Sequence, residues 1–149
     1  MADLFFTAQT AEVALVAATV KTVLQVVSPA NHRVRLKRWK VAFDGVAATA
    51  EPVQVELLRQ TTAGTMSALT PVGSDDSISE AIQSTAQHTA TAEPTAGDIL
   101  DSVEVHPQSG YEVIYPDGWE KKIGGGDRMA IRCTAPANVN VRAQMDCEE

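Results

Sequence analysis

Val139-Asn-Val-Arg-Ala-Gln-Met-Asp-Cys147 alternates apolar and polar side chains along its whole length. The apolar positions are Val139, Val141, Ala143, Met145 and Cys147. Successive side chains of a β-strand point to opposite faces, so this stretch predicts a strand with one face in a core and the other in solvent. A chain built from such segments is expected to be an all-β protein.

Similar segments precede this stretch and indicate an antiparallel sandwich. Residues 12–27 are interpreted as two strands or one long bent strand, because their β-branched density outweighs the helix preference of their alanines. The other expected strands are His32–Phe43, Pro52–Gln60, Asp98–His106, Gly110–Tyr115, Trp119–Ile123 and Arg128–Thr134. With the C-terminal segment this gives about eight strands, which is the number in a jelly roll.

His32–Phe43 changes its alternation near Lys37. Val34 and Leu36 share one parity, whereas Trp39 and Val41 share the other. A shift of one residue moves every later side chain to the opposite face, so the pattern predicts a β-bulge or a strand that passes between two sheets.

Two parts of the chain differ from these strands. Residues 1–11 are expected to form an N-terminal arm before a single domain at 12–149. Residues 61–97 are rich in Thr, Ala and Ser and are interpreted as a long exposed excursion. One short helix is expected there over Ser77–Ser84, because Ser77 and Glu80 match a capping box and Ile78 and Ile82 share a helical face.

Charge and hydropathy exclude several classes of protein. The net charge of −7 disfavours binding to nucleic acid, which requires cations against phosphates, and adsorption to anionic lipid. The apolar run Val13–Val20 is interrupted by Lys21 and is shorter than the ~20 residues of a spanning helix. No signal peptide is recognised, so the protein is expected to stay in the cytoplasm where it is made.

No motif for catalysis or metal binding is recognised. The histidines His32, His88 and His106 have no ligand spacing between them. Gly124–Gly126 precedes Asp127 instead of the Lys-Ser/Thr of a phosphate loop, which favours a simple glycine turn. We therefore expect a protein that is not an enzyme and has no metal or cofactor.

Both cysteines are expected to be free thiols. If the Thr134–Asn138 turn joins two neighbouring strands, Cys133 faces Val139 or Asn140 and Cys147 lies far along the ladder. A disulfide requires Cα atoms within about 7 Å. Free thiols are typical of a reducing compartment.

Two groups of residues are candidates for contacts with a partner. The first is the apolar tip Leu4, Phe5 and Phe6, which either covers the protein's own core or reaches a neighbouring subunit. The second is Arg33, Arg35 and Lys37, which share one parity of a basic strand in an acidic chain. That set is either a solvated face or a contact with an acidic partner.

Four stretches give the chain a resemblance to small virion proteins of tailed bacteriophages. They are Arg35-Leu-Lys-Arg-Trp-Lys-Val-Ala-Phe-Asp-Gly45, Thr91-Ala-Glu-Pro-Thr95, His106-Pro-Gln-Ser-Gly110 and Arg132-Cys-Thr-Ala-Pro-Ala-Asn-Val139. The chain resembles capsid decoration, or cement, proteins built on a jelly roll. The resemblance implies a structural role on the capsid surface of the virion, with the major capsid protein as partner.

A homo-oligomer, most simply a homotrimer, is also expected. The resemblance implies trimers, and the strands within Val13–Val27 are apolar on both faces and need cover on both. The alternatives are a phage tail or fibre component and a carbohydrate-binding β-sandwich module. The latter would use exposed aromatic side chains from the set Trp39, Tyr111, Tyr115 and Trp119.

Overall fold

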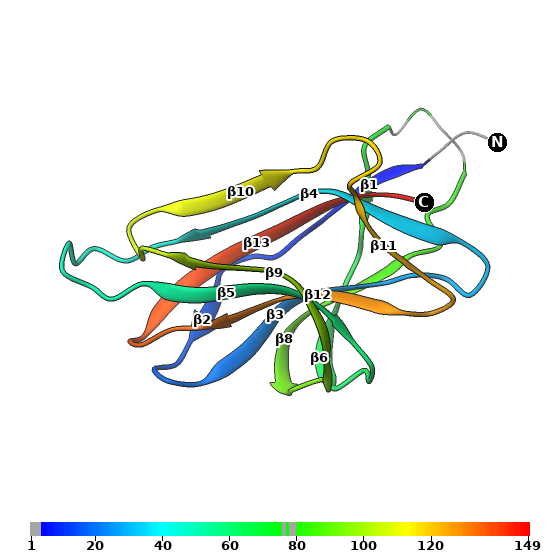
Figure 1. The fold of residues 1–149 in the computed structure, drawn as a ribbon. Coiled ribbons are helices and arrows are strands. Elements are labelled where there is room, and N and C mark those ends of the chain that lie inside the picture. Colours follow the sequence, from blue (N-terminus) through cyan, green and yellow to red (C-terminus); the bar gives the residue numbers. More distant parts are fainter. Residues whose placement is uncertain (1–3, 76, 78–79) are drawn as a thin grey trace.

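A computed structural model describes residues 4–75, 77 and 80–149 of the chain. These residues form β-strands and no helix, and two antiparallel sheets face each other as a sandwich (Figure 1). The all-β antiparallel sandwich predicted from the sequence is therefore confirmed. The expected number of eight strands is wrong, because the described residues form thirteen.

The strands are β1 (Phe5–Gln9), β2 (Val13–Leu15), β3 (Val20–Val27), β4 (Arg33–Phe43), β5 (Val53–Gln60), β6 (Thr65–Leu69), β7 (Val72–Gly73), β8 (Thr85–Ala92), β9 (Ala96–Val105), β10 (Gly110–Ile114), β11 (Lys121–Gly124), β12 (Arg128–Thr134) and β13 (Val139–Glu148). One sheet has the order β10-β4-β13-β1-β7, with β11 also on β4 and β2 also on β13. The other has the order β6-β8-β3-β12-β5-β9.

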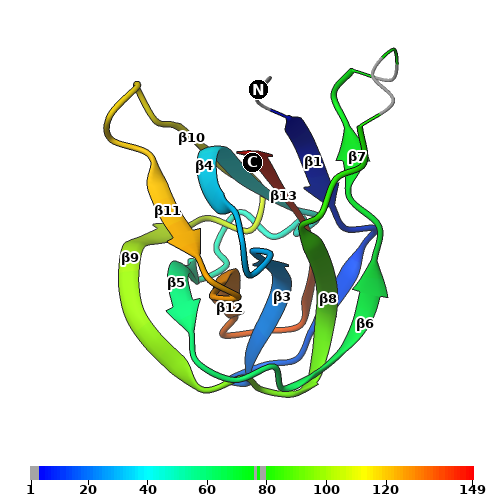
Figure 2. The ribbon, with the colours of Figure 1, turned by 90° about the vertical axis from the view of Figure 1, so that its right-hand side faces the viewer.

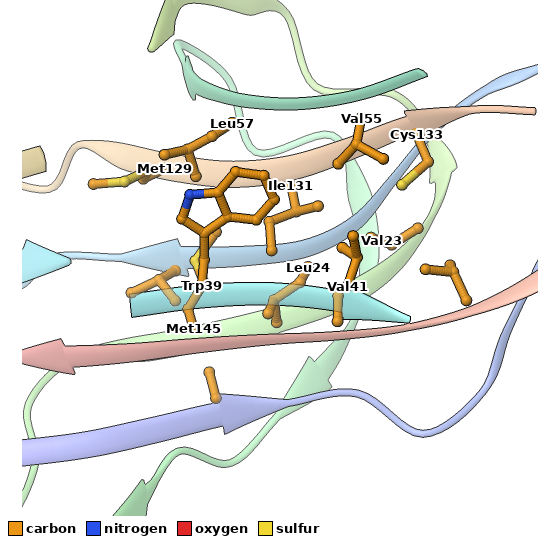
Figure 3. Close-up of a cluster of buried hydrophobic side chains, with 14 of the residues drawn as sticks. Val23, Leu24, Trp39, Val41, Val55, Leu57, Met129, Ile131, Cys133 and Met145 are labelled. Atoms are coloured by element: carbon orange, nitrogen blue, oxygen red, sulfur yellow. The ribbon is translucent and has the colours of Figure 1, made fainter. Parts of the chain in front are cut away.

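The core lies between the two sheets. Trp39 and Met145 of the seven-stranded sheet pack toward Leu24, Leu57 and Ile131 of the six-stranded sheet (Figure 3). All five side chains are fully buried. Burial of each such side chain contributes about 1.5–3 kcal/mol, so this layer holds the sheets together.

The predicted bulge in the long basic strand is confirmed. Arg38 pairs with Asp146 and Leu36 pairs with Cys147, so Lys37 is the extra residue on β4. A bulge of this kind lets both Leu36 and Trp39 point into the core although they are three positions apart in the sequence. Lys37 and Arg38 are both left on the opposite face of the sheet.

The segment 61–97, expected to be a long excursion, contains β6, β7, β8 and the start of β9. The β5–β6 and β8–β9 connections run side by side beneath the six-stranded sheet (Figure 2). The Thr61 N–H donates to Thr95 O at 3.0 Å. Gln60 pairs with Ala96 at one end of the two connections, and Thr65 pairs with Ala92 at the other. These connections form a crossing ribbon, residues 60–65 and 92–96.

The crossing ribbon covers polar side chains on the outside of the six-stranded sheet. Gln25 donates from Nε2 to Gln60 Oε1 at 2.6 Å, and Gln60 Nε2 donates to Thr22 Oγ1 at 2.8 Å. The Thr22 backbone N–H and hydroxyl both donate to the Glu93 carboxylate of the ribbon, at 2.8 and 2.7 Å. β8 pairs with β3 as far as His88, and the next residue, Thr89, has a positive φ of 54°.

The expected helix over Ser77–Ser84 is wrong. Ser77 and residues 80–84 are not helical, and Ile78 lies outside the described residues. The backbone N–H groups of Gln83 and Ser84, at 2.6 and 2.8 Å, donate to the Glu149 carboxylate. Ser77 donates to Asp75 instead of capping a helix with Glu80. A tertiary contact with the C-terminal residue therefore takes the donors that a helix would use.

The expected hairpin of the last two strands is also wrong. β12 belongs to the six-stranded sheet and β13 to the seven-stranded sheet, so the chain crosses the sandwich between them. Cys133 and Cys147 are nevertheless both free and buried, which confirms the prediction of free thiols.

Candidate binding surface

The outer face of the seven-stranded sheet is ordered in rows by the strand register. One row crosses four strands through Phe5, Glu148, Arg35 and Lys122. The next row crosses five strands through Val72, Thr7, Asp146, Arg38 and Ile114. Because paired residues of neighbouring strands point to the same face, each row forms a line of neighbouring side chains.

The middle of these rows is a network of ion pairs. Arg35 Nη1 lies 3.0 Å from Glu148 Oε1, and Arg38 Nε lies 2.6 Å from Asp146 Oδ2. The Asp146 carboxylate also accepts a hydrogen bond from the Thr7 hydroxyl at 2.7 Å. The basic strand therefore has its partners on β13 of the same sheet.

Lys37, the bulged residue, contacts three carboxylates. Its Nζ lies 2.9 Å from Glu120 Oε1, 2.9 Å from Glu148 Oε2 and 3.3 Å from Asp117 Oδ1. The hydrogen bond from Lys37 is the largest cause that lowers the pKa of Glu120 to about 2. Hydrogen bonds to Glu120 and Glu148 in turn raise the pKa of Lys37. Lys37 and Glu120 are therefore both charged at neutral pH.

A loop over residues 115–120 (the Trp119 loop) projects beside this network. β10 and β11 both pair with β4, and the loop separates them opposite the bulge at Lys37. It begins where the Tyr115 N–H donates to Lys37 O at 2.9 Å, and the Trp119 N–H donates back to Pro116 O at 3.0 Å. The turn requires Gly118, whose φ is +91°.

The Trp119 loop is fixed at both ends. At its start the buried Trp39 donates from Nε1 to the Tyr115 hydroxyl at 3.1 Å. At its end the Glu120 carboxylate, besides holding Lys37, accepts a hydrogen bond from the Gly118 N–H at 2.7 Å. Trp119 itself is 73% exposed between these attachments.

A groove of about 490 Å³ separates the Trp119 loop from β1. Phe5, Arg35 and Lys37 contribute to its walls, and the rest of the lining is Asp117, Gly118, Glu120, Lys122 and Glu148. Phe5 is half-exposed at this edge. The exposed Phe5 and the loop that carries the exposed Trp119 therefore lie on opposite sides of the ion pairs around Lys37.

The structure places some of the contact residues predicted from the sequence in the groove and buries others in the core. Phe5, Arg35 and Lys37 come together in the groove, whereas Leu4 and Phe6 are buried in the core. Arg33 is exposed at the start of β4, where it pairs with Gly124. Leu4 and Phe6 therefore cover the protein's own core and are not accessible to a partner.

Sequence reasoning missed the residues that neutralise the basic strand. Glu120, Asp146 and Glu148 lie far from it in the sequence, and only the strand register brings them to it. Within the described part of the chain, Arg33 and Lys40 are the cations of that strand without an ion pair. Trp119 was expected to begin a strand over Trp119–Ile123, whereas the structure places it in the loop before β11, which begins at Lys121.

The aromatic side chains do not form a platform for a sugar. Trp39 is fully buried, and Tyr111 and Tyr115 pack against the core. Only Trp119 of this group is largely exposed.

A second recess, of about 810 Å³, lies at the end of the sandwich where the 44–52 and 136–138 loops meet Pro107. Val16 and Val46 on its rim are 52% and 89% exposed. The Gly45 N–H donates to Pro107 O at 2.8 Å, which holds the 44–52 loop in place.

Among residues 4–75, 77 and 80–149, no three His, Cys, Asp or Glu side chains are grouped so that they could hold a metal ion. The same residues include no helix with the length and apolar character needed to cross a membrane. Comparison with protein-family models, curated proteins and solved structures found no match to this chain.

Proposed function

We propose that this chain is a structural virion protein of a bacteriophage that docks on the capsid surface as a decoration, or cement, protein. The observation that carries the proposal is the presentation of Trp119. An exposed tryptophan on a loop fixed at both ends loses little entropy when it enters a partner's pocket. Tryptophan is also among the residues most enriched at the energetic centres of protein interfaces.

The strand pairing supports the jelly roll that this resemblance implies. β1 and β2 can be counted as one interrupted strand, and so can β10 and β11. The first strand, β1/β2, then pairs with the last strand, β13. Moving inward from the two ends of the chain, β3 pairs with β12, β4 with β10/β11, and β5 with β9. This nested order, with β6–β8 as an insertion, is that of a chain wound as one long antiparallel ribbon.

The partner we propose is the major capsid protein, contacted by many copies of this chain on one lattice. Docking through the Trp119 loop and Phe5 buries apolar surface, while the internal ion pairs need no partner charge. The basic strand is thus proposed to position the loop and not to steer association. Binding through it is expected to depend weakly on salt, because the charges are already neutralised within the sheet.

A sedimentation assay tests the proposal. Purified chain is mixed with capsids, free of tails, from a phage strain in which its gene is disrupted, and the capsids are pelleted. Saturable binding is expected, and Trp119→Ala should weaken it about 30-fold, since truncating an interface hot spot costs about 2 kcal/mol or more. Ile99→Ala, which removes an exposed apolar side chain from the other sheet, is the matched control and should bind as the wild type.

Three outcomes would contradict the proposal or a part of it. Failure of the wild-type chain to pellet with capsids would remove the proposed function altogether. Binding to purified tails in place of capsids would assign the chain to the tail or fibre class. Equal binding by the wild type and Trp119→Ala would show that the Trp119 loop is not the contact.

A further inference from the structure

We propose that two copies of this chain associate through β6, so that their six-stranded sheets join edge to edge. The proposal concerns a different surface from the Trp119 loop and does not depend on capsid binding. It rests on a comparison of the sheet edges within this molecule.

Edge strands expose unpaired backbone N–H and C=O groups, and proteins usually block them with charges, bulges or interruptions. β9 is one edge of the six-stranded sheet, and it carries Asp98, Asp101 and Glu104 and shows register shifts against β5. The β10/β11 edge of the other sheet is interrupted by the Trp119 loop. β7, at the remaining edge of that sheet, has only two residues.

β6 has neither charges nor an interrupting loop, although its register against β8 shifts between Thr65 and Ser67. It pairs with β8 on one side and, in the part of the chain that the structure describes, with no strand on the other. Its residues, Thr-Met-Ser-Ala-Leu, contain no charge, no proline and no glycine. Thr65, Ser67 and Ala68 are exposed, and their small side chains allow a second strand to approach closely.

The segments on either side of β6 in the sequence, and the paired strand β8, also lack acidic and basic side chains. No Asp, Glu, Lys or Arg occurs between Arg59 and Asp75, and none occurs between Glu80 and Glu93, which spans the neighbouring β8. The chain as a whole has a net charge of −7. Two such molecules repel each other through most of their surfaces, and the β6/β8 region is where this repulsion is least.

These features favour a second copy as the occupant of the edge. An antiparallel strand placed against its own copy across a two-fold axis offers each molecule the same set of donors and acceptors. Such an isologous contact closes at two copies, and it produces one continuous sheet of twelve strands, six from each molecule.

The mass of the protein in solution tests the proposal. Light scattering after size exclusion, over the micromolar range, should give twice the chain mass of 15.9 kDa. Ser67→Lys places a charge on the β6 edge and should return the mass to that of one chain. Ser102→Lys makes the same substitution at an exposed position of the β9 edge, and this control should keep the doubled mass.

Circular dichroism and the fluorescence of the buried Trp39 verify that each variant is folded. Backbone amide exchange in residues 65–69 gives a second measurement, and it should slow as the wild-type concentration rises. A single-chain mass for the wild type, or a doubled mass for Ser67→Lys, would overturn the proposal. A mass of three chains would also overturn it, because a two-fold strand pair cannot form a trimer.

Discussion

The ammonium group of Lys37 lies 2.9 Å from a carboxylate oxygen of Glu120, and this ion pair joins the bulge of β4 to the loop that presents Trp119. Lys37 is the extra residue of the bulge, so its side chain is directed to the outer face beside Arg38. Without that extra residue the later part of β4 would turn Trp39 out of the core. The same local irregularity therefore serves both the packing of Trp39 and the position of Trp119.

Removing the charge of Glu120 should loosen the Trp119 loop. Glu120→Gln keeps the shape of the side chain but replaces the charge-assisted hydrogen bond with Lys37 by a weaker neutral one. Amide exchange over residues 115–120 should accelerate by up to about fivefold, with other strands unchanged. Asp117→Asn is the control, because the Asp117 side chain is 97% exposed although it also contacts Lys37. Equal effects of the two variants would argue against a special role for Glu120.

The same loop should respond to acid. The pKa of Glu120 is lowered from 4.5 to about 2, chiefly by the hydrogen bond from Lys37. A carboxylate whose pKa is lower in the folded state stabilises that state above its unfolded pKa, and the contribution disappears as the pH falls toward the folded value. The indole NMR signal of Trp119 should therefore shift between about pH 4.5 and pH 2. A Glu120→Gln variant that showed the same shift would assign it to another group.

The thiols should be unreactive until the protein unfolds. Burial raises the pKa of Cys133 to about 12 and also raises the pKa of Cys147. Since the thiolate is the reactive form, a disulfide reagent should detect neither thiol in the native protein. Both should react in denaturant without prior reduction, because both are free. Rapid reaction of either thiol in the native state would show that its strand opens readily.

Sequence patterns were reliable where one face of a strand meets the core and the other meets solvent. The alternation of Val139–Cys147 gave β13, and the parity change near Lys37 gave the bulge, because both follow from the two-residue period of a strand. The exposure of Phe5 beside the buried Phe6 follows the same period. The local pattern did not reveal which strand pairs with which, so Glu148 was not recognised as the partner of Arg35 and Lys37.

The patterns failed where a strand is covered on both faces or is stabilised by distant residues. β6 and β8 are rich in small and polar residues, and their stability comes from mutual pairing and from the crossing ribbon. Gln25 and Gln60 look like solvent-facing residues, yet they are buried because they bond to each other beneath that ribbon. The helix expected at Ser77–Ser84 failed because Glu149, at the far end of the chain, binds the N–H groups of Gln83 and Ser84.

Glu93 should be a strong stabilising residue of the crossing ribbon. Its carboxylate accepts both the backbone N–H and the hydroxyl of Thr22, which is fully buried. Glu93→Ala leaves those donors without a partner, and an unsatisfied buried donor costs about 1–3 kcal/mol. Urea unfolding should show this loss, whereas Glu51→Ala, at an exposed carboxylate of the 44–52 loop, should change stability little. Equal stabilities for the two variants would mean that water replaces the Glu93 contacts.

Removal of residues 1–11 should prevent cooperative folding. The sequence alone indicated a detachable arm, but β1 lies in the seven-stranded sheet between β13 and β7, and both Phe6 and Ala8 are fully buried. Truncating one buried Phe to Ala costs about 3–5 kcal/mol, which is a large part of the 5–15 kcal/mol that stabilises a typical domain. Phe6→Ala should therefore melt far below the wild type, while Phe5→Ala, at a half-exposed position in the same strand, should melt close to it. Thermal unfolding followed by circular dichroism distinguishes these cases. A truncated chain that melted cooperatively at the wild-type temperature would show that β1 is dispensable and would restore the arm as a free binding element.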